Sequence, residues 1–220
     1  MMKVVSPSHE ILFMPDTDSI LSCIEMAGRT CYKSEDKITS GSAMEFAGRL
    51  IKMGHLSVIE HFSITVKFIC DRGVTHELVR HRLASYSQES TRYANYSRDR
   101  FGKEITVIKP VFWDEDSLPY RLWYSAMEQA ENSYMKLLES GARPEQARSV
   151  LPNSLKTEIV MTCNLRQWRH VFELRCASAA HPQIREIMLP LLEDFHASVP
   201  ILFDDLFEKF SADIRTISEK

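Results

Sequence analysis

The chain reads FSITVKFICDRGVTHELVRHRLASYSQESTRY over residues 62–93. Apolar side chains occupy every second position from Phe62 to Cys70 and alternate with Ser63, Thr65 and Lys67, and this period of two predicts a strand with one buried face. The pattern then changes, and residues 73–82 predict a short helix with Arg80–Arg82 at its C-terminal end, where the helix dipole favours cations. A strand followed by a short helix indicates a protein of mixed class.

Around this stretch, the sequence predicts more helix than strand. Apolar residues at helical spacing lead to Gly141 and predict one long helix before it. Ser42 with Glu45 predicts a capping box, Gly54 a helix end, and Pro190 a kink or break. The expected helices are 17–31, 43–53, 118–140, 167–178, a short one carrying Arg148 and helix from Pro182 onward, and a further strand is expected at 158–164.

The expected fold class is therefore α/β of the α+β type. A small antiparallel sheet is surrounded by helices, with one long helix and a helical C-terminal part. At 220 residues and 44% hydrophobic composition, the chain is expected to form one domain over residues 1–220. It contains no apolar run near eighteen residues and no secretory signal pattern, so we expect a soluble, cytoplasmic protein without membrane contact.

Charge is distributed unevenly along the chain. The whole sequence carries a net charge of -3, which argues against bulk nucleic-acid binding. Between Arg72 and Lys103, however, seven Lys and Arg residues face three acidic ones. This local positive site predicts a phosphorylated ligand. No Gly-x-Gly is present, so a glycine-rich phosphate loop is not expected.

Four separated motifs resemble those of the flavin-dependent thymidylate synthases, which methylate dUMP with a folate carbon and a flavin hydride. The central one is Arg-His-Arg, two residues, Ser85, four residues, Ser90, one residue, Arg92 and Tyr93. The others are Gly54-His55-Leu56-Ser57 with Glu60-His61, Ala147-Arg148 with Leu151-Pro152, and Asn164-x-Arg166 with Leu174-Arg175. They occur in the family's order and span roughly residues 29–187.

The resemblance implies roles for individual residues. Arg175 matches the arginine that faces the base, where it would stabilise charge at N3 and O4 of uracil, so it is the expected catalytic residue. Arg92 and Arg148 match the phosphate-binding arginines. The expected dUMP ligands are Glu77, Leu78, Val79, Arg80, Gln88, Glu89, Ser90, Thr91, Arg92, Arg148 and Arg175. The expected FAD ligands are His55, Ser57, Glu60, Arg80, His81, Arg82, Gln88, Asn164, Arg166 and His170.

The resemblance also implies the co-substrates and the assembly. FAD is the cofactor, NADPH its reductant and 5,10-methylenetetrahydrofolate the carbon donor. No Pro-Cys pair exists, so no cysteine nucleophile is expected. A homotetramer with sites shared between subunits is implied. Three positions depart from the family pattern. This chain has Gln88 where many members have glutamate, Glu77 where glutamine is common and His170 where asparagine is common.

Two other functions compete with this interpretation. A metallohydrolase would use His55, His61, His76-Glu77 and His81. His76 and His81 are five residues apart, however, which turns them away from each other on a helix. The five cysteines form no Cys-x-x-Cys pair, so no metal is expected. A single-stranded nucleic-acid module would bind the nucleic-acid backbone along Arg80–Arg100 and stack bases on Tyr86, Tyr93, Tyr96 and Phe101.

Overall fold

The computed structural model describes residues 2–218. The chain divides into two compact units. The first contains the N-terminal residues up to His9, Lys67–Arg80 and Tyr86–Val160. The second contains Glu10–Val66, His81–Ser85 and the chain from Met161 onward. The expectation that the chain acts as one domain stays a prediction.

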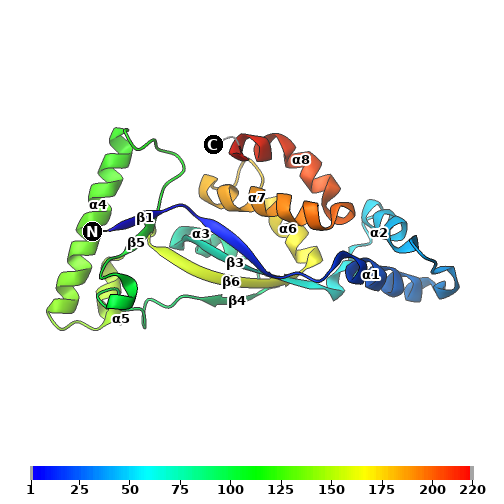
Figure 1. Cartoon of the computed structure of the whole chain (residues 1–220), viewed down its shortest axis with the longest axis horizontal. Coiled ribbons are helices and arrows are strands. Elements are labelled where there is room, and N and C mark those ends of the chain that lie inside the picture. The colour runs from blue at the N-terminus through cyan, green and yellow to red at the C-terminus, as the bar shows by residue number, and fades with distance from the viewer. Residues whose placement is uncertain (1, 219–220) are drawn as a thin grey trace. The chain divides into compact units, whose positions relative to one another are not determined.

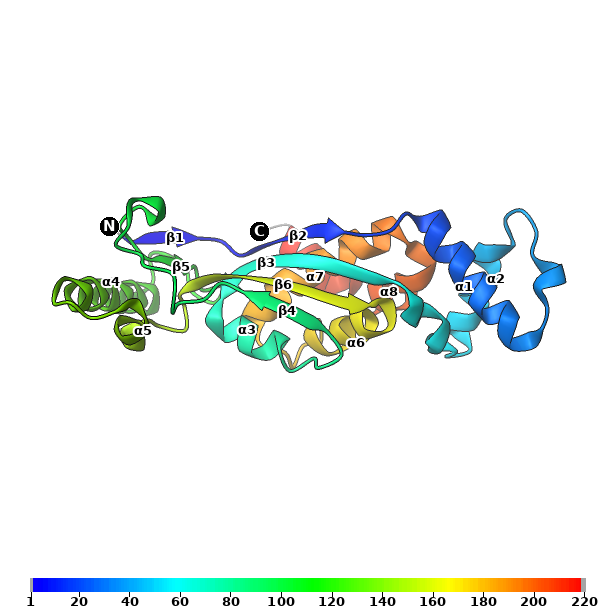
Figure 2. The same cartoon turned by 90° about the horizontal axis from the view of Figure 1, so that it is seen from below.

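Two sheets are formed. β1 (Lys3–Val5) pairs in parallel with β5 (Thr106–Ile108), a pair that the sequence did not reveal. The larger sheet has the order β2 (Ser8–Phe13), β3 (Ser63–Asp71), β6 (Lys156–Asn164), β4 (Ser85–Gln88), and Figure 2 shows the four strands next to one another in this order. Backbone hydrogen bonds from Leu165 to Phe62 and from Arg72 to Asn153 show that β3 and β6 are antiparallel. The mixed class with a small antiparallel sheet is confirmed.

The strand and the short helix of residues 62–93 are both present. Ile64, Val66, Phe68 and Cys70 are buried on one face of β3, as the alternation predicted. Asp71 then caps α3 (Arg72–Leu78) by accepting a hydrogen bond from the backbone N–H of Val74 at 2.6 Å.

The placement of Arg80–Arg82 inside this helix was wrong. α3 ends at Leu78, and Val79 is its C-cap. In a longer helix, the Leu78 carbonyl would accept a hydrogen bond from the backbone N–H four residues further along. Here it accepts one from the Tyr86 hydroxyl instead, at 2.7 Å. The three basic residues therefore lie in the segment between α3 and β4, and the helix dipole does not explain them.

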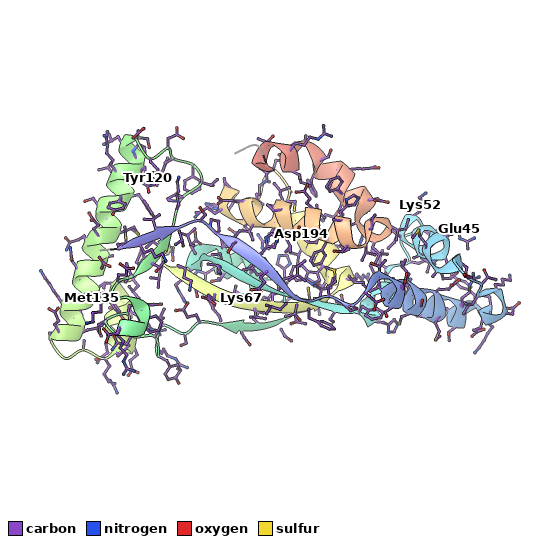
Figure 3. The ribbon with its side chains drawn as sticks, viewed as in Figure 1. Glu45, Lys52, Lys67, Tyr120, Met135 and Asp194 are labelled. Atoms are coloured by element: carbon purple, nitrogen blue, oxygen red, sulfur yellow. The ribbon has the colours of Figure 1, made fainter. Side chains whose placement is uncertain are left out.

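The first unit is built around α4 (Leu118–Glu139), which confirms the expected long helix. Ser117 caps its start, and Gly141 follows its end in a left-handed conformation. Tyr120 and Met135, labelled in Figure 3, pack against a core that includes Trp123 and Tyr134. α5 (Pro144–Ala147), η3 (Asp99–Phe101) and η4 (Arg148–Val150) complete the helical turns of this unit.

The second unit is mainly helical, and its helices match the predicted ranges closely. Trp168, Phe172, Phe195 and Phe203 form its aromatic core, with ring centroids 5.1 to 6.0 Å apart. α7 (Pro182–Ser198) and α8 (Pro200–Ser218) pack side by side (Figure 1). The helices are α1 (Thr17–Tyr32), η1 (Glu35–Lys37), α2 (Ser42–Lys52), η2 (Leu56–His61), α6 (Leu165–Arg175), α7 (Pro182–Ser198) and α8 (Pro200–Ser218).

One local prediction in this unit was wrong, and a second is decided only in part. Gly41, not Ser42, is the N-cap of α2, because the Ser42 hydroxyl bonds to Glu25 and to the Thr39 backbone. Pro190 lies inside α7, so the helix is not broken there, and a kink at this position stays a prediction. Among residues 2–218, no helix is long and apolar enough to cross a membrane.

Candidate active site

Helix α6 presents three of the residues singled out by sequence. Its first turn is capped by Asn164, whose side-chain oxygen accepts a hydrogen bond from the Gln167 backbone N–H at 2.9 Å. Trp168 and Phe172 bury one face of the helix. The helical period therefore leaves Arg166, His170 and Arg175 outside that buried face.

A cavity of about 920 Å³ opens beside the exposed side of α6. The Arg166 guanidinium is held there by the Glu60 carboxylate, with the Nη1 and Oε1 atoms 2.6 Å apart. Arg169 pairs in the same way with Asp205. Four of the residues expected to bind FAD line this cavity: Glu60, Asn164, Arg166 and His170.

A second, smaller cavity is also lined by Arg166. Its volume is about 310 Å³, and it is lined by two further residues expected to bind FAD, His55 and Ser57. The Tyr32 hydroxyl lies 3.5 Å from Nδ1 of His55. Arg166 lines both cavities. Six of the ten expected FAD ligands thus lie around two cavities that share one guanidinium.

The histidine of the Arg-His-Arg motif contacts the expected catalytic arginine. Nε of Arg175 donates a hydrogen bond to Nε2 of His81 at 2.9 Å. His81 is buried, and its ring makes a T-shaped contact with the His170 ring, with centroids 5.9 Å apart. Burial, helped by the positive charge of Arg175 and by His170, lowers the pKa of His81 to about 4. His81 is therefore a neutral acceptor near pH 7. Arg82, by contrast, is exposed.

The first unit contains a third cavity, of about 1070 Å³. Three of the residues expected to bind dUMP line it: Gln88, Glu89 and Ser90. The Gln88 amide nitrogen lies 3.1 Å from the Thr75 hydroxyl and 3.3 Å from the Thr157 hydroxyl. Both threonines are buried, so they hold the amide in place from within the protein.

The two expected phosphate-binding arginines are also in the first unit. Arg148, the first residue of η4, donates from Nη1 to the hydroxyl of buried Thr91 at 3.2 Å. Arg92 is exposed, and its guanidinium lies 5.3 Å from the centroid of the Tyr93 ring. Because Thr91 precedes Arg92 in the chain, the contact brings Arg148 to the segment that carries Arg92.

The remaining expected dUMP ligands surround the end of α3. Leu78 is buried, so its side chain serves packing, and its carbonyl bonds to Tyr86. Val79 and Arg80 are exposed, and Glu77 is half-buried. Arg175 belongs to the second unit, while the other expected dUMP ligands belong to the first. Their convergence on one nucleotide stays a prediction.

Sequence reasoning missed a charged network that lines the third cavity. The Glu158 carboxylate contacts Lys67 at 2.5 Å and Lys156 at 2.6 Å, and these hydrogen bonds lower its pKa. Lys156 also reaches Glu89, which accepts from the Tyr96 hydroxyl at 3.1 Å. The alternation along β3 could have indicated this network, because it places Lys67 on the polar face of the strand, opposite the buried residues.

Three of the cysteines, and some of the aromatic residues that a nucleic-acid module would use, contribute to packing. Burial raises the pKa of the Cys70, Cys163 and Cys176 thiols. Tyr96 packs its ring against Phe101 and Tyr134, whereas Tyr93 is 74% exposed. Within residues 2–218, no group of three or more His, Cys, Asp or Glu side chains is placed to hold a metal ion.

Comparisons with known proteins cover nearly all of this chain. The family model described as thymidylate synthase complementing protein matches residues 14–201. A flavin-dependent thymidylate synthase of Geobacter sulfurreducens is 32% identical over 203 residues, covering 89% of this chain and 86% of that protein. One from Pyrococcus furiosus is 33% identical over 180 residues, covering 81% and 73%. The crystal structure of a UMP/dUMP methylase, PolB from Streptomyces cacaoi bound with 5-Br dUMP, is similar with a TM-score of 0.75 and 26% identity, covering 94% of this chain and 97% of that one.

Proposed function

This chain belongs to the family of flavin-dependent thymidylate synthases, and from that premise we propose that it methylates dUMP to dTMP. FAD is the proposed cofactor, 5,10-methylenetetrahydrofolate the carbon donor and NADPH the reductant. The products are then dTMP, tetrahydrofolate and NADP⁺. The observation that favours this function most is the set of expected flavin ligands from η2 and α6 that line one cavity.

The residues around this cavity fit a flavin dinucleotide. Cavities of about 300 to 1000 Å³ are typical of cofactor sites, and this one lies within that range at about 920 Å³. Arg166, held by Glu60, offers guanidinium N–H groups suited to a diphosphate. His55, Ser57, Asn164 and His170 offer further polar contacts. When bound, the flavin supplies the hydride that completes the methyl group.

Arg175 carries the proposed catalytic role of the protein itself. C5 of uracil becomes nucleophilic when negative charge that develops at N3 and O4 is stabilised, and a guanidinium can do this. Arg92, Arg148 and Ser90 bind the phosphate of dUMP in this proposal. None of these steps uses a cysteine, which agrees with the raised pKa of the three buried thiols.

The proposal is tested first by the visible spectrum of the purified protein with FAD, titrated with dUMP. We expect a protein-bound flavin band that shifts on addition of dUMP, followed by dTMP formation when the folate and NADPH are supplied. UMP is the matched ligand control, since it differs by one hydroxyl. Absence of flavin binding in a folded sample contradicts the proposal and directs attention to oligonucleotide binding through the segment that carries Arg80.

We also propose that the chain acts as a single domain that assembles into a homotetramer with sites shared between subunits. Mixing two inactive variants, Arg148→Ala and Arg175→Ala, tests this directly. If one site takes these arginines from different subunits, mixed oligomers contain some sites with both arginines and regain activity. If activity does not return after verified subunit exchange, each site draws both arginines from one chain. Light scattering gives the oligomeric state.

A further inference from the structure

The Arg175 side chain extends from the end of a helix, so another residue is needed to fix its orientation. Arg175 is the last residue of α6, and the backbone N–H of Cys176, its C-cap, returns to the Phe172 carbonyl. An arginine side chain has several rotatable bonds, and ordering it costs up to about 2 kcal/mol of rotamer entropy. Electrostatic catalysis depends on a donor that is already oriented before the reaction begins. A fixed partner is therefore valuable here.

His81 provides such a partner from a distant part of the chain. Its Nε2 accepts the hydrogen bond from Nε of Arg175 at 2.9 Å, across 94 positions of sequence. A neutral imidazole has one acceptor nitrogen and one N–H. Since Nε2 accepts, the proton of the neutral ring resides on Nδ1. This assigns the tautomer of His81 from the contact with Arg175.

The imidazole itself has little freedom to move. His81 is 5% exposed, and its ring makes a T-shaped contact with the ring of His170, which lies earlier on α6. A buried ring in fixed contact with the same helix can define the direction of the Nε–H bond of Arg175. Because the guanidinium is planar, fixing Nε–H restricts the plane in which its other N–H groups lie.

We propose that His81 is a positioning residue, which orients the guanidinium of Arg175 toward the substrate rather than binding FAD through its own side chain. This inference rests on the proposed function, because it takes Arg175 as the arginine that faces the uracil base. It differs from the expectation drawn from the family resemblance, which gave His81 a direct flavin contact.

The test compares His81→Phe with His81→Gln. Phenylalanine keeps a planar ring but removes the acceptor, whereas glutamine retains an acceptor oxygen near the position of Nε2. We expect His81→Phe to lower kcat for dTMP formation by about 10- to 100-fold, because small misplacements of a catalytic group have effects of this size. His81→Gln recovers most of the loss. His76→Phe, the same exchange on the exposed surface of α3, leaves kcat unchanged.

The FAD dissociation constant distinguishes positioning from flavin contact. In His81→Phe it stays within about threefold of the wild-type value, a change below about 1 kcal/mol. A large loss of FAD affinity together with activity overturns the proposal. A double-mutant cycle with Arg175→Lys adds a second criterion: the effects of the two substitutions on dUMP affinity are strongly non-additive if His81 acts through Arg175. Additive effects contradict it.

The proposed function and this inference fail in different ways. If wild-type protein with FAD shows no spectral response to dUMP, the proposed function is wrong. If the wild-type protein responds and His81→Phe behaves like it, only the positioning role is wrong. Circular dichroism establishes that each variant is folded. Should His81→Phe not fold, His81→Leu replaces it in the same cycle, again with His81→Gln as the conservative variant.

Discussion

Replacing Trp168 by phenylalanine tests how α6 is held in place. The Trp168 side chain is completely buried, and its indole N–H donates to the Ile64 carbonyl on β3 at 3.1 Å. Its ring also packs against Phe172 and Phe195, with centroids 5.8 and 5.3 Å away. Phenylalanine retains part of this packing, but it loses the donor and leaves unfilled volume.

The expected loss of stability has two parts. Removing a buried hydrogen bond whose acceptor stays behind costs about 1 to 2 kcal/mol. The smaller ring loses apolar burial and leaves a cavity, for a further cost of about 1 to 2 kcal/mol. Together these predict that Trp168→Phe lowers the free energy of unfolding by about 2 to 4 kcal/mol.

Urea unfolding measures this change at fixed protein concentration, since assembly would otherwise shift the apparent stability. Trp113→Phe is the matched control. Trp113 is only partly buried, against the core of the first unit, so we expect it to cost less than about 1 kcal/mol. Equal losses for the two variants would refute the argument from burial and from the Ile64 hydrogen bond.

Three further outcomes follow from the same contacts. Arg175→Ala should lower kcat for dTMP formation by about 10²- to 10³-fold, as removal of one electrostatic donor does, while FAD absorbance titrations show binding close to wild type. Thr157→Val removes one of the two hydroxyls that hold Gln88, so the dissociation constant for dUMP should rise about fivefold, and Thr157→Ser should restore it. The lowered pKa of His81 predicts acid sensitivity: the unfolded chain binds more protons between about pH 6.5 and 4, so the free energy of unfolding should fall as the pH falls through this window. Urea unfolding of His81→Gln at several pH values should show a smaller decrease.

The sequence predicted the long elements because their side-chain periods are clear. β3 has apolar residues at every second position up to Cys70, and α4 repeats its apolar residues toward Gly141, so both were found with nearly correct ends. The short strands β1 and β5 have only three residues each, too few for a period to appear. Their pairing depends on residues about one hundred positions apart, which local patterns do not report.

Contacts between distant residues explain the corrections as well. The local pattern of residues 73–82 predicted a helix through Arg82, but the Tyr86 hydroxyl donates a hydrogen bond to the Leu78 carbonyl instead. Ser42 has the residue type of an N-cap, yet its hydroxyl bonds to Glu25 on α1. In both cases a side chain from another segment competes with the local backbone pattern.

The same kind of contact accounts for the candidate site. Motifs located Arg175 and His81 separately, because each belongs to a recognisable segment. Motif matching does not detect their hydrogen bond, since it joins the Arg-His-Arg motif to the end of α6, 94 positions away in the sequence. The network of Lys67, Lys156 and Glu158 was missed for another reason: a polar face of a strand normally indicates solvent, not a set of paired charges.

The Gln88 departure from the family pattern has a physical basis in its neighbours. The Thr75 hydroxyl donates its only proton to the Arg72 carbonyl at 2.9 Å, so toward residue 88 it can only accept. A glutamine meets this requirement with its amide N–H at 3.1 Å. An ionised glutamate has no proton to offer, and it would force Thr75 to turn away from Arg72. Glutamine at position 88 is thus matched to the Thr75 hydroxyl behind it, which directs its carbonyl oxygen away from the two threonines.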